Sequence, residues 1–545
     1  MSGAEPPSTV PALLSRVVAA RGRHDAIAMV QETVSYQELE RRTARMARAL
    51  LAIGAGKGAR IALMAPDGIF WITAFLAGLR IGALMSVVST LCTPPELAHI
   101  LRNSDIQIFI GARRFLRHDY TRTLTAALPS LGAGRAEALR TPEAPYLRSV
   151  WLDDAEGLDW ARSIEELLAR ADGADAPDAT LLAAVEREVA PSDEAVIVYT
   201  SGSTSAPKAV VHTQGNVTCH PRALADYFLL KPGDRMLPQL PAFWLGGMVM
   251  AIEVLSVGAT LVYPESPDIE VVAGALERLG VNRVNGWGDG LAKLRQAATA
   301  RGIDVDAIVG LGPFRDEAGE LIPPQLQVNM LGMSETFAAH SAERLDFRLP
   351  DDKAGASGRT VGGYERRVVD PETGQEVALG EVGELQIRGG GLMSGFYKVD
   401  RSRVFTADGF YPTSDLVRLD ADGYLFFVAR RGDMIKTKAA NVSRLEVEAA
   451  LRALPGVELP IVVGLPDPDL GQMVAAAIVP APGVTLVPEA LQAALRETLS
   501  SYKVPRRIVF ISHDDVPRTA TGKLKLFELA GMIAAQTGDE AAHKP

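Results

Sequence analysis

The sequence predicts an α/β protein with a large N-terminal domain and a smaller C-terminal α+β domain. Helical patterns alternate with short apolar runs over residues 35–110 and again over residues 195–310, the rhythm of parallel sheets covered by helices. Over residues 357–428, short strands separated by glycine-bearing turns predict a small antiparallel or barrel-like unit. We therefore expect two parallel-type subdomains plus this β unit in residues 1–431, and one compact second domain in residues 432–545.

The first alternating stretch predicts three helix–strand pairs. In chain order, we expect a helix over 35–53, a strand over 60–64, a helix over 70–79, a strand over 83–88, a helix over 95–103 and a strand over 106–110. Residues 68–88 contain one charge, Arg80, but Gly78 and Gly82 divide the run into elements of ordinary length. We interpret this run as a buried helix and strand rather than a membrane span.

The second alternating stretch begins after an exposed connector. We expect this connector over 172–178, a helix over 179–189, a strand over 195–199, a helix over 216–228, a strand over 260–262, a helix over 271–279 and a strand over 307–310. Strands over 383–388 and 424–428 belong to the small β unit.

Composition and charge exclude several classes of protein. The chain has 545 residues, 47% of them hydrophobic and 22% charged, which is typical of a globular protein. Its 56 basic and 66 acidic residues give a net charge of −10, which argues against duplex binding. Cys92 and Cys219 form no CxxC pair, so a zinc or iron–sulfur site is not expected. Without a secretion signal at the N-terminus, we expect a cytoplasmic protein with no transmembrane segment.

A hydroxyl-rich loop is the most informative segment. Residues 196–211 read VIVYTSGSTSAPKAVV, an apolar strand followed by five hydroxyl residues around Gly202 and then by Lys208. Hydroxyl and backbone N–H donors with little bulk, together with a lysine, suit a polyphosphate. No Gly-Lys-Ser/Thr closes the loop, so it is not the signature of a P-loop NTPase. Taken alone, the segment also fits a serine-rich surface turn.

Four further motifs follow in order along the chain. They are LGMSET at 331–336, YPTSD at 411–415 before DGY at 422–424, ARRGDMIK at 429–436 and PRTATGK at 517–523. With the hydroxyl-rich loop, the ordered set resembles the adenylate-forming superfamily, which contains acyl-CoA synthetases, the adenylation domains of peptide synthetases and firefly luciferase. The resemblance extends from about Leu13 to about Leu529.

The resemblance implies that a carboxylate attacks the α-phosphate of ATP in the presence of Mg²⁺, giving acyl-AMP and pyrophosphate. This reaction brings anions together, so positioning and charge neutralisation dominate catalysis. Glu335 matches the acidic residue that helps to hold Mg²⁺, and Ser334 stands where a threonine usually contacts the α-phosphate; alone, the pair also fits a helix cap. The β- and γ-phosphates are assigned to Thr200, Ser201, Gly202, Ser203, Thr204 and Lys208.

Three charged residues complete the implied nucleotide site. Asp415 matches the acid that accepts hydrogen bonds from the ribose hydroxyls, and Arg430 matches the arginine near the ribose and phosphates. Lys523 matches the catalytic lysine that the mobile C-terminal domain inserts beside the reacting carboxylate and the α-phosphate. Taken singly, Asp415 fits a solvated loop position and Lys523 fits a solvated surface position.

The adenine side departs in part from the family pattern. Gly312 and Pro313 match a turn whose backbone approaches adenine, where glycine permits close contact. Leu331, followed by Gly332 and Met333 of the nucleotide site, replaces the usual aromatic residue, so part of the stacking on the base is missing.

A second segment matches the family's carboxylate-substrate pocket. It contains Trp244, where the family usually has histidine, followed by Gly246, Gly247 and Met248. Together with Trp287, it predicts an apolar wall that fits a hydrophobic acid. Two buried core tryptophans are the alternative interpretation.

The hinge and the CoA channel also differ from the pattern. Gly432 lies at the hinge, followed by Lys436, Lys438 and Ala439. Ala439 stands where a glycine usually leaves room for the pantetheine arm of CoA, so its Cβ predicts a narrower channel.

We therefore predict an ATP- and Mg²⁺-dependent acid–CoA ligase that forms acyl-AMP and then acyl-CoA. One alternative is an enzyme that stops at acyl-AMP or transfers the acyl group to a carrier-protein thiol. The other is a non-catalytic nucleotide-binding homologue.

Overall fold

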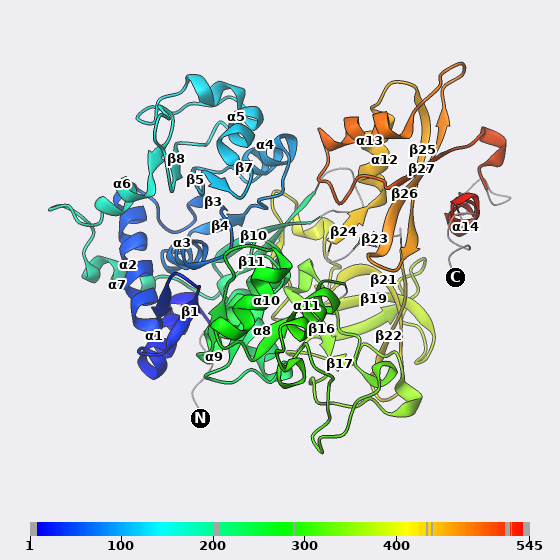
Figure 1. Ribbon diagram of the computed structural model, residues 1–545, viewed down its shortest axis with the longest axis horizontal. Coiled ribbons are helices and arrows are strands. Elements are labelled where there is room, and N and C mark those ends of the chain that lie inside the picture. The colour runs from blue at the N-terminus through cyan, green and yellow to red at the C-terminus, as the bar shows by residue number, and fades with distance from the viewer. Residues whose placement is uncertain are drawn as a thin grey trace.

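The computed structural model describes residues 8–200, 207–286, 289–431, 434–437, 440–517, 524 and 526–537. Figure 1 shows a larger part, coloured blue to yellow, and a smaller C-terminal unit beside it, coloured orange to red. Both parts combine helices with sheets, so the predicted α/β class with a smaller C-terminal α+β unit is confirmed.

An eight-stranded sheet is the largest in the described chain. Its order is β20-β11-β10-β4-β3-β5-β8-β9, and the strands from β10 to β9 run parallel. β11 and β20 add an antiparallel edge. The bounds are β3 (Arg60–Met64), β4 (Leu84–Val87), β5 (Ile108–Gly111), β8 (Ser149–Leu152), β9 (Arg162–Ser163), β10 (Glu194–Thr200), β11 (Lys208–Thr213) and β20 (Gly395–Phe396).

A five-stranded sheet has the order β14-β12-β13-β1-β2, with β2 antiparallel to the others. Its strands are β1 (Asp25–Ala28), β2 (Thr33–Ser35), β12 (Arg235–Pro238), β13 (Thr260–Val262) and β14 (Arg283–Asn285). Strands far apart in the chain therefore pair with each other: β1, which precedes the first alternating stretch, pairs with β13, and β10 of the second stretch pairs with β4 of the first.

One predicted strand is wrong. Residues 305–307 form a single 3₁₀ turn, and Val309 makes only an isolated bridge to Arg283. The predicted run over residues 307–310 was too short for its pattern to distinguish a strand from a turn.

Two short sheets occur in and just before the region of the predicted small β unit, residues 357–428. One has the order β15-β16-β17: β15 (Leu331–Met333) and β16 (Ala338–Ala342) precede the predicted bounds, and β17 (Arg359–Thr360) lies within them. The other is antiparallel with the order β18-β19-β21-β22, formed by β18 (Glu365–Val369), β19 (Val382–Arg388), β21 (Tyr411–Leu419) and β22 (Leu425–Arg430). A two-stranded hairpin, β6 (Arg114–Phe115) and β7 (His118–Asp119), lies elsewhere in the chain.

Helices α1 to α11 belong to the larger part. They are α1 (Val10–Arg21), α2 (Tyr36–Ala52), α3 (Ile69–Arg80), α4 (Pro94–Asn103), α5 (Tyr120–Ala127), α6 (Ile164–Ala169), α7 (Ala179–Arg187), α8 (Gln214–Tyr227), α9 (Leu245–Val257), α10 (Ile269–Arg278) and α11 (Asp289–Ala300). Six of these helices were predicted, and both ends of each lie within two residues of the predicted ends: α2, α3, α4, α7, α8 and α10.

Helix α3 settles the interpretation of the apolar run. It has 12 residues, nearly all buried, because it packs in the principal core. Its Arg80 is buried too, and its guanidinium donates to the hydroxyl of Thr43 and pairs with Glu186. Among the described helices, none is long and apolar enough to cross a membrane.

The C-terminal unit has a core of its own. Its sheet contains β23 (Met434–Thr437), β24 (Ala440–Ser443), β25 (Val457–Asp467), β26 (Gly471–Pro480) and β27 (Arg507–Phe510), with helices α12 (Arg444–Arg452), α13 (Pro488–Arg496) and α14 (Leu526–Thr537). Along β25, Val462 packs in one apolar cluster, while its neighbours Ile461 and Val463 pack in the other. Successive side chains of a strand point to opposite faces, so the sheet separates two apolar layers.

Candidate active site

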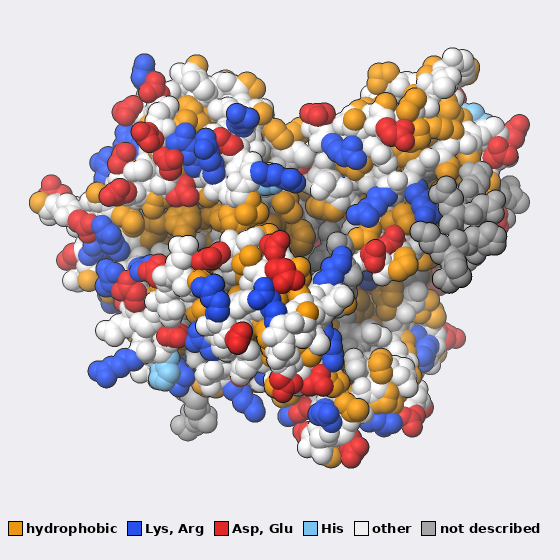
Figure 2. Space-filling view, in the orientation of Figure 1, with side chains coloured by type: hydrophobic (Ala, Val, Ile, Leu, Met, Phe, Trp, Pro, Cys, Tyr) orange, Lys and Arg blue, Asp and Glu red, His pale blue; other side chains and the backbone are white. Residues whose placement is uncertain are grey.

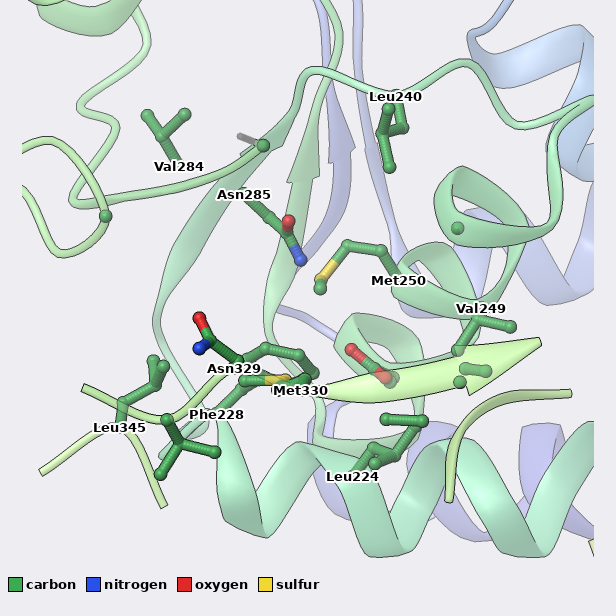
Figure 3. A pocket seen from close by; sticks show the side chains of 18 of the residues that line it. Leu224, Phe228, Leu240, Val249, Met250, Val284, Asn285, Asn329, Met330 and Leu345 are labelled. Atoms are coloured by element: carbon green, nitrogen blue, oxygen red, sulfur yellow. The ribbon is translucent and has the colours of Figure 1, made fainter. Parts of the chain in front are cut away.

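A central pocket of about 860 Å³ lies among α8, α9, β14, β15 and β16. In Figure 3, Leu224 and Phe228 come from α8 and its C-terminal end, Val249 and Met250 come from α9, and Asn285 comes from β14. Most of the lining is apolar, with a few polar groups, which is the usual character of a small-molecule site.

Helix α9 presents one face to this pocket. The lining residues Leu245, Gly246, Val249, Met250 and Glu253 recur at the spacing of one helical face. Gly246, which was predicted for the carboxylate-substrate pocket, therefore lines the central pocket.

The next two predicted residues lie elsewhere. Met248 is fully buried in the principal core and is not part of the pocket lining. A Cβ on Gly247 would come within 2.2 Å of the carbonyl oxygen of Pro241, so glycine lets the helix start against this turn.

Ser334 and Glu335 lie in the turn that joins β15 to β16, and Ser334 lines the pocket. Glu335 is buried, and its carboxylate accepts a hydrogen bond from the Tyr411 hydroxyl at 3.0 Å. The backbone N–H of Met393 donates to the Glu335 carbonyl at 2.8 Å. Phe337, two residues after Glu335, has φ +49°. Such a backbone conformation is unusual for a non-glycine residue and often occurs at functional sites.

A buried histidine also fixes this turn. The Nε2 of His212 on β11 lies 2.7 Å from the Ser334 carbonyl oxygen. Burial lowers the pKa of His212 to about 3, so the ring is neutral at pH 7 and Nε2–H donates to the carbonyl. The serine–glutamate turn is therefore connected to the eight-stranded sheet.

The hydroxyl-rich loop joins two paired strands. Thr200 ends β10 and lies opposite Lys208, the first residue of β11. The Lys208 ammonium lies 5.1 Å from the centre of the Phe396 ring. Ser201, Gly202, Ser203 and Thr204 lie outside the described residues.

Asp415 is buried on β21, opposite Arg430 on β22. The residue before it, Ser414, has φ +63° and donates its N–H to the Glu384 carboxylate at 3.0 Å. Glu384 also pairs with Arg431 at 3.2 Å. Arg431 is exposed, but its charge helps to hold the backbone beside Asp415.

The predicted adenine turn contributes to the pocket mainly through its first residue. Gly310 lines the pocket with φ +95°, and a Cβ there would lie 2.0 Å from the Val284 carbonyl oxygen. Gly312 and Pro313 follow outside the lining. Leu331 is buried in an apolar cluster with the β18–β22 sheet, while Gly332 and Met333 line the pocket.

The C-terminal unit contacts the larger part near this pocket. Trp244, the N-cap of α9, makes an edge-to-face contact with Tyr502, with ring centres 6.5 Å apart. Lys436 on β23 belongs to the pocket lining. Figure 1 shows β23 and β24 directed from the C-terminal unit toward the centre of the molecule, and Figure 2 shows a hollow between the two parts.

A buried ion cluster, formed by Glu96, Glu446, Ser500 and Lys503, joins the two parts. Lys503 Nζ lies 2.9 Å from Glu96 on α4 and 2.8 Å from Glu446 on α12. The Ser500 hydroxyl donates to Glu96 at 2.7 Å. Burial disfavours the ammonium, but Tyr502 and the two carboxylates raise the pKa of Lys503 above its ordinary value. The lysine is therefore charged and bridges the parts.

Several predicted residues remain untested. Trp287, Gly432, Lys438, Ala439 and Lys523 lie outside the described residues, as does the side chain of Arg430. Three features near the site were not singled out from the sequence: Tyr411 within YPTSD, the Glu96–Lys503 bridge between the two parts, and Glu253 in the pocket lining. A lone glutamate in the otherwise apolar segment 245–257 was the available signal for Glu253.

The fold and this site define an AMP-binding enzyme. The chain matches the AMP-binding enzyme family over residues 16–397 and the AMP-binding enzyme C-terminal domain over residues 446–523. The chain therefore belongs to this family, and the predicted membership of the adenylate-forming superfamily is confirmed.

Its relatives include CoA ligases. The chain is 29% identical to the 3-hydroxybenzoate–CoA/4-hydroxybenzoate–CoA ligase of Thauera aromatica, covering 94% of this chain and 95% of that protein. It is also 29% identical to a feruloyl-CoA synthase of Amycolatopsis sp, covering 90% and 92%. Its fold is similar to that of the amide bond synthetase McbA from Marinactinospora thermotolerans, with a TM-score of 0.74, 24% identity, and coverage of 95% and 99%.

Replacing Lys503 tests the buried ion cluster. In Lys503→Met, two buried carboxylates lose their cation, which typically destabilises a protein by about 3–5 kcal/mol. We expect the two parts to separate, so that small-angle scattering shows a larger radius of gyration while each part keeps its secondary structure by circular dichroism.

Arg388→Met is the control for this experiment, because it removes an exposed ion pair with Glu365 within the larger part. It should leave the scattering profile unchanged. An unchanged radius in Lys503→Met would show that the cluster does not hold the parts together.

Proposed function

We propose that this protein is an ATP- and Mg²⁺-dependent ligase that converts a hydrophobic carboxylic acid into acyl-AMP and then into its CoA thioester. One observation carries the proposal: the apolar central pocket is lined by Gly332, Met333 and Ser334 of the LGMSET motif at residues 331–336. An acid in this pocket would have its carboxylate beside the segment that the family uses for ATP.

The buried carboxylates support the roles proposed for the nucleotide site. Asp415 and Glu335 are both buried acceptors on neighbouring segments, suited to ribose hydroxyls and to a cation respectively. Mg²⁺ is commonly held by one or two carboxylates together with substrate phosphates and water.

We assign the remaining roles from the motifs. Lys208 and the hydroxyl-rich loop hold the β- and γ-phosphates, and Arg430 lies near the ribose. Lys523 neutralises charge between the reacting carboxylate and the α-phosphate. Residues 432–545 form the mobile domain, with Gly432 at its hinge, and Trp244 and Trp287 lie beside the acid.

Tyr411→Phe tests whether Glu335 holds Mg²⁺. The variant keeps the ring but loses the hydrogen bond to the carboxylate, an interaction worth about 1.5 kcal/mol or more with a charged group. We expect the Mg²⁺ concentration for half-maximal adenylation to rise about tenfold.

Tyr364→Phe is a matched control, because the Tyr364 hydroxyl donates instead to the backbone carbonyl of neighbouring Thr336, at 2.7 Å. It should leave the Mg²⁺ requirement unchanged. Equal shifts in both variants would contradict a specific role for the Glu335 carboxylate.

Lys523→Ala tests the first half-reaction. Removing a preorganised charge from a transition state typically lowers the rate about 100- to 1,000-fold. We expect such a loss in acid-dependent exchange of labelled pyrophosphate into ATP, while ATP binding changes by only a few-fold.

Lys525→Ala serves as the nearby control and should retain exchange. Undiminished exchange in Lys523→Ala would remove the catalytic assignment. Absence of exchange in the wild type with every acid tested would instead favour a non-catalytic nucleotide-binding protein.

One departure from the family favours a second candidate function. Ala439 replaces the glycine that usually leaves room for pantetheine, so acyl transfer to free CoA could be slow relative to adenylation. In this alternative, the enzyme stops at acyl-AMP or passes the acyl group to another nucleophile, such as a carrier-protein thiol.

Ala439→Gly distinguishes these candidates. If the Cβ narrows the channel, single-turnover thioester formation should accelerate about tenfold in the variant, while formation of acyl-AMP keeps its rate. Equal thioester rates in the variant and the wild type would show that Ala439 does not limit the second step.

A further inference from the structure

Glu253 stands out among the residues of the central pocket. It is the one acidic or basic residue of α9, whose remaining side chains are apolar or small. Its side chain is buried, with only 1% exposed, and it belongs to the pocket lining. A carboxyl group in such surroundings is unfavourable unless a partner satisfies it.

The structure gives Glu253 no such partner among the described residues. Its Oε2 is buried and has no hydrogen-bond partner. Burial raises the pKa of Glu253 well above its ordinary value, with no neighbouring cation to oppose the shift. Burial therefore favours the neutral form of the carboxyl group, which can both donate and accept a hydrogen bond.

The other charged residues of the pocket lining differ from Glu253 in this respect. Three of them form ion pairs: Arg283 with Asp234 at 3.4 Å, Glu343 with Arg359 at 2.7 Å, and Arg344 with Asp346 at 2.6 Å. The fourth is Lys436, whose ammonium lies 4.9 Å from the centre of the Phe427 ring. Unlike Arg283, Glu343 and Arg344, Glu253 therefore has no oppositely charged partner, and its Oε2 has no hydrogen-bond partner.

The position of Glu253 on α9 indicates which end of an acid it meets. Trp244 caps the N-terminal end of the helix and contacts Tyr502 of the C-terminal unit. Glu253 lies nine residues further along, about 14 Å at the helical rise of 1.5 Å per residue. Val249 and Met250 line the apolar wall between these two positions.

We propose that Glu253 is a specificity-determining residue, which selects an acid whose far end carries a hydrogen-bonding hydroxyl or amino group. This inference rests on the proposed ligase function, because it assumes that the acid lies in the central pocket. The hydroxyl or amino group would donate to the Glu253 carboxyl group, whose Oε2 otherwise has no partner, while Val249 and Met250 contact the carbon skeleton.

Matched acids test this selectivity. We would measure kcat/KM for acid-dependent pyrophosphate release with straight-chain acids of six to twelve carbons and with arylpropanoic acids. Each skeleton would end in a methyl, a hydroxyl or an amino group. At the best length, the wild type should prefer a hydroxyl or amino end over methyl by at least tenfold.

Two variants and one control test whether Glu253 causes the preference for hydroxyl- or amino-ended acids. Glu253→Leu should abolish or reverse the preference. Glu253→Gln should retain it for hydroxyl while losing it for amine, because an amide cannot ionise to pair with an ammonium group. Met250→Leu alters the same wall without a polar atom and should keep the wild-type order.

Thermal unfolding without substrate provides a second readout. Because Glu253→Leu removes a buried group without a partner, its Tm should equal or exceed that of the wild type. A preference for methyl-ended acids in the wild type, an unchanged order in Glu253→Leu, or a lower Tm in that variant would overturn the inference. Failure of the ligase function would appear differently, as no pyrophosphate release with any acid.

Discussion

The buried carboxylate of Glu335 is the constraint on which the site depends. It can remain buried because Tyr411, from another sheet, donates to it and because the backbone around it is fixed by Met393 and His212. These contacts bring together β15, β21, β11 and the segment before β20. A charge that must be buried and satisfied thus aligns separate sheets at one point.

The position of the C-terminal unit beside the larger part also depends on buried charges that are satisfied by partners. Lys503 neutralises Glu96 across the boundary, but one cation cannot fully neutralise two carboxylates, and burial raises the pKa of Glu446. Such a cluster favours one relative orientation without a large apolar interface. The separate core of the C-terminal unit means that its fold does not depend on this contact.

The sequence predicted the α/β class and most helices, because periodicity over ten or more residues is a strong signal. It did not predict that β1 pairs with β13 or that β10 pairs with β4, since pairing over long separations leaves no local pattern. The motifs located Glu335 and Asp415, which the structure places in neighbouring buried segments. At α9, however, a run of adjacent residues was assigned to the pocket, and helical geometry turned Met248 into the core while directing Val249 and Glu253 inward.

Helix α9 also shows how specificity can oppose stability. An apolar residue in place of Glu253 would fit the surrounding wall and would leave no buried polar atom without a partner, so stability alone would favour it. A polar side chain there is favourable only when something in the pocket completes its hydrogen bonds. An acid that supplies this hydrogen bond then gains an interaction that a wholly apolar acid cannot make, because Oε2 is already desolvated and without a partner before the acid binds. The pocket can thus discriminate by relieving a cost that the protein carries in its unliganded state.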